Sequence, residues 1–133
     1  MTALAVLGCS MGLESESSAH VGLTCVDDSK QCIDQRSSAL SSIINDKERK
    51  WIREPATPAA YASGVRLFAF KHRKRELTCD ELAIGRREAE NASSALRGAG
   101  ASGLTPAQVS RGAMLGGEVS RELAAEMQRR CRA

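Results

Sequence analysis

Four cysteines constrain the fold of this chain more than any other feature: Cys25, Cys32, Cys79 and Cys131. The remaining apolar content is modest, because 20 residues are alanine and only four are Phe, Trp or Tyr. The chain length of 133 residues fits one domain, and a core built mainly from small side chains buries little apolar surface. We therefore expect disulfides to supply a large share of the stability.

Two helices are predicted in the first half of the domain. Residues 29–52 should form the first helix, because their apolar side chains recur along one helical face. Pro55 follows the end of this helix. Thr57 is a hydroxyl cap and Pro58 lacks the N–H that a first helical turn leaves unpaired, so a second helix should span 58–74. Its predicted apolar face contains Tyr61, Val65, Phe68 and His72.

Two more helices are predicted in the second half. Thr78 can cap a helix that begins at Cys79, has acidic residues in its first turn and ends at the glycines of 98–100. Residues 105–108 form a capping box with Pro106 at the first helical position. The helix that follows should bury one face and run towards Cys131; the residues on that face are Val109, Gly112, Gly116, Val119, Leu123 and Met127.

These four helices, without any sustained period-two pattern, predict an all-α fold: a small antiparallel four-helix bundle. Up-down-up-down order would bring all four cysteines to one pole of the bundle. Three pairings are then possible, and the sequence does not choose among them. We favour Cys25–Cys32 as a local link and Cys79–Cys131 as a link between the third and fourth helices.

Two other uses of these cysteines stay open. Thiolates together with His72 could bind zinc, but structural zinc ligands usually come in pairs two to four residues apart, and Cys25 and Cys32 are seven apart. We therefore expect no metal. Cys79 lies at a predicted helix N-terminus just after a basic run, an environment that favours a reactive thiolate.

A basic run, residues 71–75, is the strongest charge feature of the chain. We expect it to bind an anionic lipid surface, with these candidate residues: Arg66, Lys71, Arg73, Lys74 and Arg75. The bundle topology would place the run at the pole where the N-terminal segment enters. Nucleic acid is a rival ligand, and a solvated helix end that only complements the helix dipole is the simplest alternative.

Catalytic motifs in the structural context that they require are absent from the sequence. It contains no Gly-x-x-x-x-Gly-Lys loop and no His-Glu-x-x-His. Residues 8–12 match Gly-x-Ser-x-Gly and residues 98–103 match Gly-x-Gly-x-x-Gly, but neither follows a predicted strand, which both motifs need. Glu88 and Glu90 are two residues apart, so on a helix they point to different sides. We expect a protein that is not an enzyme and uses no cofactor. No apolar run approaches the roughly 18 residues of a membrane-spanning helix.

The N-terminal residues Val6-Leu7-Gly8-Cys9 resemble the lipobox of small bacterial envelope lipoproteins. The resemblance implies a lipid on Cys9 and divides the chain into a truncated signal-like leader (1–8), a flexible tether (9–24) and a helical domain (25–133). The tether is rich in Ser, Glu and Gly, and a random coil of this length reaches roughly 20 Å. Because 1–8 carries no charge, unlike the start of a secretory signal, we expect the true start to lie upstream of Met1.

A second resemblance covers under a third of the chain. Cys25 and Cys32, followed by a predicted helix that ends Glu48-Arg49-Lys50-Trp51-Ile52, are similar to lysozyme-inhibitor-like helical proteins of the periplasm. This resemblance implies a binding module that blocks an enzyme by surface contact. The inhibitory residues of that family have no matching positions here.

The sequence thus predicts a non-enzymatic envelope lipoprotein, a binding or structural module held on the periplasmic side of the membrane. Its expected partners are the membrane surface, reached through the lipid anchor, and an envelope protein. Cysteines in such an oxidising compartment form disulfides. The alternatives are a cytoplasmic basic helical domain that binds nucleic acid and a thiol-dependent redox protein that uses Cys79.

Overall fold

A computed structural model of the protein describes residues 23–98 and 103–131, and its secondary structure there is entirely helical. The elements are α2 (Lys30–Ile44), the 3-10 helix η1 (Lys50–Arg53), α3 (Pro58–Ser63), α4 (Val65–Arg73), α5 (Cys79–Arg97) and α6 (Pro106–Arg130). None of the helices in these two ranges is long and apolar enough to span a membrane. The leader, Cys9 and the tether up to residue 22 lie outside the described residues.

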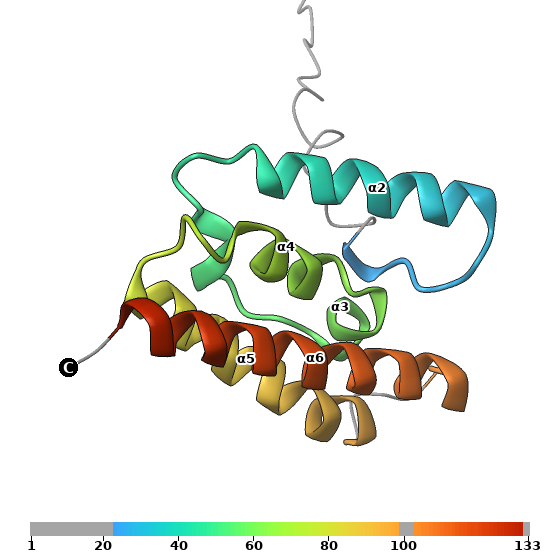
Figure 1. Ribbon diagram of the computed structural model, residues 1–133. Coiled ribbons are helices and arrows are strands. Elements are labelled where there is room, and N and C mark those ends of the chain that lie inside the picture. The colour runs from blue at the N-terminus through green and yellow to red at the C-terminus, as the bar shows by residue number, and fades with distance from the viewer. Residues whose placement is uncertain (1–22, 99–102, 132–133) are drawn as a thin grey trace, which may run out of the picture.

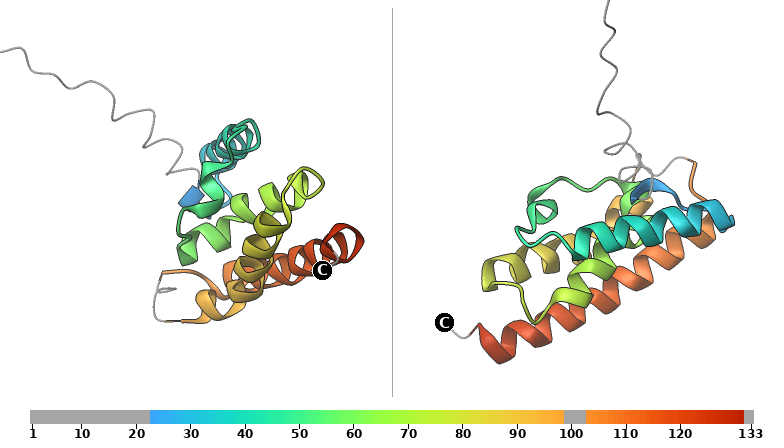
Figure 2. Two further views of the ribbon diagram at one scale, coloured as in Figure 1. Left: turned by 90° about the vertical axis from the view of Figure 1, so that its left-hand side faces the viewer. Right: turned by 90° about the horizontal axis from the view of Figure 1, so that it is seen from above.

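The helices are stacked in three tiers (Figures 1 and 2). α5 and α6 lie side by side and antiparallel as the base, α3 and α4 lie across them, and α2 packs on α4. The core lies between the base and α4, and its buried side chains include Trp51, Ile52, Leu67, Phe70, Leu77, Leu82, Val119 and Leu123.

The sequence predictions for α5 and α6 are confirmed, because local capping determines where both helices begin. The Thr78 hydroxyl accepts a hydrogen bond from the backbone N–H of Glu81, and the Glu81 carboxylate accepts one from the N–H of Thr78. Thr105 and Gln108 form the same reciprocal pair at α6. Each box satisfies two N–H groups that the helix itself leaves unpaired.

The first predicted helix, 29–52, is wrong in its second half, because α2 ends at Ile44. Asp46 accepts hydrogen bonds from the backbone N–H groups of Glu48 and Lys50, so its side chain stabilises a turn in place of another helical turn. Arg49 follows in the left-handed region with φ of 53°. The turn brings Trp51 into the core, where a continued helix would have carried it past the body of the domain.

The second predicted helix, 58–74, is divided at Gly64 into α3 and α4. Gly64 has a φ of 76°, and a Cβ atom there would lie 2.8 Å from Leu115 Cδ2. The break changes which face of α4 is buried. Leu67 and Phe70 enter the core, whereas Phe68, expected on the apolar face, remains 46% exposed.

The expected up-down-up-down order does not describe this structure, because α2 and α4 run in the same direction. Residues 45–57 double back along the body before α3 begins (Figure 1). The C-terminal ends of the two helices therefore meet, and Arg73 Nη2 donates a hydrogen bond of 2.8 Å to the carbonyl of Ile44.

Both disulfides form with the favoured pairing, Cys25–Cys32 and Cys79–Cys131, with Cα–Cα distances of 5.6 and 5.7 Å. The prediction of a single pole is wrong. Gln108 at the start of α6 donates to the carbonyl of Val26, whereas Cys131 follows the end of this helix of 25 residues, about 37 Å away at 1.5 Å per residue. We call these opposite ends of the body the Cys25 end and the Cys131 end.

Gly116 sets the distance between α5 and α6. A Cβ at Gly116 would lie 2.8 Å from both Ala89 O and Ala92 Cβ. We predict that Gly116→Ala lowers the free energy of unfolding by about 1–3 kcal/mol, the usual cost of overpacking. The neighbouring change Gly117→Ala meets only the end of the Arg121 side chain at 3.5 Å, so it should leave stability unchanged or raise it by up to about 1 kcal/mol. Urea denaturation of the oxidised protein measures both.

The two disulfides should differ in their contributions to stability. Cys79–Cys131 closes a loop of 52 residues and Cys25–Cys32 one of seven, so loop-closure entropy assigns them about 4 and about 2 kcal/mol. The double serine variant of the first pair should therefore unfold at lower urea concentration than that of the second. Equal midpoints would contradict this ranking.

Candidate functional site

Arg66 was expected on the surface, and the structure buries it with 3% exposure. Its guanidinium forms a two-bond pair with the Glu88 carboxylate, with distances of 2.6 and 3.0 Å, and donates to the carbonyl of Trp51 at 2.6 Å. Arg66 also lies over the Trp51 ring, 5.6 Å from its centroid. Its prediction as an anion-binding surface residue is wrong, because these contacts use its charge inside the protein.

The other basic candidates are surface residues that mostly have carboxylate partners. Lys71 pairs with Glu118 at 2.7 Å and with Glu122 at 3.5 Å, and the hydrogen bond with Lys71 lowers the pKa of Glu118. Lys74 lies 3.6 Å from Glu122. Arg75 is exposed and has no partner among the described residues. The net field of the run is therefore weaker than its sequence indicates.

The basic run lies at the Cys131 end of the body. Arg130 near the end of α6 donates to the carbonyl of Lys74 at 2.8 Å. The described chain begins at the other end, beside Val26 and the start of α6. The prediction that the tether and the basic run share one face is therefore wrong, and the reason is the parallel direction of α2 and α4.

The zinc site and the reactive thiolate considered for these cysteines both require free sulfur atoms. Cys25, Asp27 and Cys32 bring potential ligand atoms within 4.8 Å of one another, but both sulfurs belong to a disulfide. Cys79 is likewise bonded to Cys131. Neither disulfide offers the free thiolate that a zinc site or a nucleophile needs.

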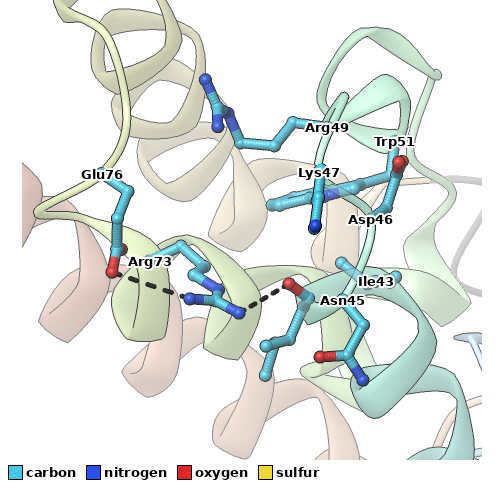
Figure 3. A pocket seen from close by; sticks show the side chains of 9 residues that line it. Ile43, Asn45, Asp46, Lys47, Arg49, Trp51, Arg73 and Glu76 are labelled. Atoms are coloured by element: carbon cyan, nitrogen blue, oxygen red, sulfur yellow. Dashed lines mark hydrogen bonds and ion pairs between the residues drawn. The ribbon is translucent and has the colours of Figure 1, made fainter.

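A pocket of about 320 Å³ lies beside the turn that follows α2 (Figure 3). We call it the Trp51 pocket; its lining residues are Ile43, Ile44, Asn45, Asp46, Lys47, Arg49, Trp51, Arg73 and Glu76. α2 supplies the apolar isoleucines, the turn supplies the charged residues at 46–49, and α4 contributes Arg73. Arg73 lies between Glu76 and the end of α2, bonded to both.

Arg49 holds the turn of this pocket against α5. Its Nε donates to Glu81 Oε2 at 2.8 Å. Burial raises the pKa of Glu81, but the hydrogen bonds from Arg49 and from the backbone of Thr78 outweigh it, so the pKa lies below its usual value. The stabilising contribution of this carboxylate is therefore present above the usual pKa of glutamate and is lost as the pH falls through the lowered value.

A second concave region surrounds Phe68. Cavities of about 280 and 320 Å³ adjoin its exposed ring, one reaching Arg36 and Leu115 and the other Leu40 and His72. Aromatic residues are enriched at protein interfaces, so this surface is a candidate for binding. The sequence pattern had assigned Phe68 to the core.

The sequence predicted a buried Trp51 and a surface Arg73, but it did not predict that both line one pocket. The pocket depends on the turn at 45–49, which the prediction of a helix over 29–52 concealed. The adjacent Asn45 and Asp46 are the signal that could have revealed it, because both residue types favour turns and compete with helical hydrogen bonding.

The chain matches no protein-family model, no curated protein and no solved structure.

The pair Arg66–Glu88 should be far more important for stability than a surface pair. Arg66→Ala leaves the Glu88 carboxylate partly buried and uncompensated, so we predict a loss of about 3–5 kcal/mol in the free energy of unfolding. Arg86–Glu90 is a matched control on α5, the helix that carries Glu88. Its side chains are 46% and 47% exposed, so Arg86→Ala should lower the free energy of unfolding by less than about 1 kcal/mol. Chemical denaturation measures both, and similar losses would contradict the assigned role of Arg66.

Proposed function

We propose that the protein is an exported, non-enzymatic binding module of the bacterial envelope, held near the membrane through a lipid on Cys9. The observation that carries the proposal is the pairing of four cysteines into two disulfides, one at each end of the body. Structural disulfides persist in oxidising compartments and are rare in the cytosol.

The composition of the core supports the same compartment. Apart from Trp51 and Phe70, its buried side chains are aliphatic or small, so disulfides that each contribute about 2–4 kcal/mol supply a large share of the stability. A reducing cytosol would remove both links. The fold should therefore be more stable after export than in the cytosol.

Attachment to the membrane is assigned to the lipid on Cys9 rather than to the basic run. Arg66 is buried, and Lys71 and Lys74 have carboxylate partners. The run also lies at the end of the body opposite Val26, near which the tether would join. The binding role is assigned to the Trp51 pocket and the surface around Phe68.

Intact mass and thiol counting of protein made in bacteria from a gene with its native upstream sequence test this proposal. We expect a lipid adduct on Cys9 in the membrane fraction, and cysteines that react with an alkylating reagent only after reduction. Cys9→Ala should abolish the adduct and release the protein from the membrane. The matched double variant Cys25→Ser/Cys32→Ser should retain the adduct.

The opposite result identifies the alternative class. An unmodified chain in the cytosolic fraction whose cysteines react without reduction would overturn export. Co-purification of that chain with nucleic acid, lost on treatment with nuclease, would then support the cytoplasmic nucleic-acid-binding role.

A further inference from the structure

The Trp51 pocket contains donors that lack a hydrogen-bond partner among the described residues. Trp51 is 6% exposed, and its indole Nε1 is buried with no partner among the described residues. Lys47 is exposed, and no described residue pairs with its ammonium group. An unpaired buried N–H is costly and rare in folded proteins, so an acceptor bound at this nitrogen would be stabilised.

The main acceptors of the pocket are already in use. Asp46 accepts from two backbone N–H groups of the turn through its two carboxylate oxygens, at 3.2 and 3.0 Å. The carbonyl of Ile44 accepts from Arg73. Asn45 is exposed and offers both a donor and an acceptor. Glu76 is exposed and faces Arg73 at 3.6 Å. Lys47 and the Trp51 indole are therefore the groups that a ligand with acceptor oxygens would satisfy.

The indole is held in place before any ligand arrives. Phe70 packs edge-on against Trp51, with ring centroids 4.7 Å apart and an interplanar angle of 62°. Arg66 lies over the same indole and donates to the Trp51 carbonyl. An indole fixed in this way loses little conformational entropy when a ligand binds. Together with Ile43 it offers an apolar surface beside the charged turn.

The charges of the lining favour a ligand with one negative charge. Arg49 pairs with Glu81, and Arg73 lies 3.6 Å from Glu76. Within the part of the chain that the structure describes, Lys47 is thus the cation of the pocket that lacks a counter-ion. A doubly charged group such as phosphate would face the carboxylates of Asp46 and Glu76 without enough compensating charge.

We infer that the Trp51 pocket binds a small monocarboxylate with an apolar body. Lys47 and the indole N–H of Trp51 would hold the carboxylate, and the apolar body would lie on Ile43 and the indole. The volume of about 320 Å³ is at the lower end of ligand pockets, which limits the ligand to a small molecule. This inference rests on the binding role proposed above and supplies its site and ligand class.

Binding includes a movement of Lys47. The indole nitrogen is closed to solvent, and in the view of Figure 3 the Lys47 side chain lies in front of the indole. An exposed lysine on a flexible four-carbon chain changes rotamer readily. Its rotation towards the carboxylate would give the ligand access to the nitrogen.

Trp51 is the only tryptophan of the chain, so its indole N–H gives one recognisable peak in a proton–nitrogen correlation spectrum. We propose titrating the full oxidised chain with sodium hexanoate and, separately, with hexanamide and inorganic phosphate. Hexanoate should shift the indole peak saturably. Hexanamide, which has the same body without the charge, should bind at least about tenfold more weakly, since hydrogen bonds to charged groups are the stronger ones. Phosphate should also bind at least about tenfold more weakly, because it lacks the apolar body and its second charge would face Asp46 and Glu76.

Two lysine variants provide the matched comparison. Lys47→Met should weaken hexanoate binding by about tenfold, whereas Lys50→Met, three residues away and not in the lining, should leave it unchanged. An indole peak that does not shift saturably, equal binding of hexanamide or phosphate, or an unchanged affinity in Lys47→Met would each overturn the inference. These results are independent of the lipid on Cys9, so failure here is distinguishable from failure of the proposed export.

Discussion

The buried charge of Arg66 is the interaction on which the rest of this structure depends. Its guanidinium connects the 3-10 helix through the Trp51 carbonyl, α5 through Glu88 and the aromatic core through the Trp51 ring. A buried cation is tolerated only when its donors are satisfied. The chain therefore has to return after α2 and place residues 50–53 against α4, and this return makes α2 and α4 parallel.

Small residues determine the other half of the architecture. α5 and α6 approach closely because Gly116 faces the backbone of Ala89 and the Cβ of Ala92. With so few large side chains available, close backbone packing supplies dispersion contacts that a larger core would obtain from Leu and Phe. The abundance of alanine is thus a requirement of this helix pair as well as a limit on hydrophobic burial.

Local signals were sufficient to predict α5 and α6. Both helices begin at reciprocal capping boxes, whose hydrogen bonds form within four residues and need no tertiary contact. The helix ends at Ile44 and Gly64 were not predicted. The apolar stripe outweighed the local turn signals of Asn45, Asp46 and Gly64, and the contacts that accompany these ends, Arg73 with α2 and Leu115 with Gly64, are long-range. The error then spread to the direction of α4 and to the ends at which the disulfides lie.

The candidate site shows the same limit. Arg66 and Arg73 were selected for their charge, but charge alone does not distinguish a surface cation from one that a carboxylate 22 residues away draws into the interior. Trp51 was placed on an apolar stripe, which correctly indicated burial. Its unpaired nitrogen and the adjoining turn become apparent only when the segments 43–51 and 73–76 lie together.

The position of Cys79–Cys131 also has a mechanical consequence. This disulfide encloses α5 and α6 in a covalent ring, whereas α2, α3 and α4 lie outside it. If tension is applied between the N-terminus and the C-terminus, the part before Cys79 can unravel, but the 52-residue segment up to Cys131 cannot lengthen. The disulfide would prevent about 180 Å of extension. Under force, α2, α3 and α4 could therefore unfold while the length of the segment from Cys79 to Cys131 stays fixed.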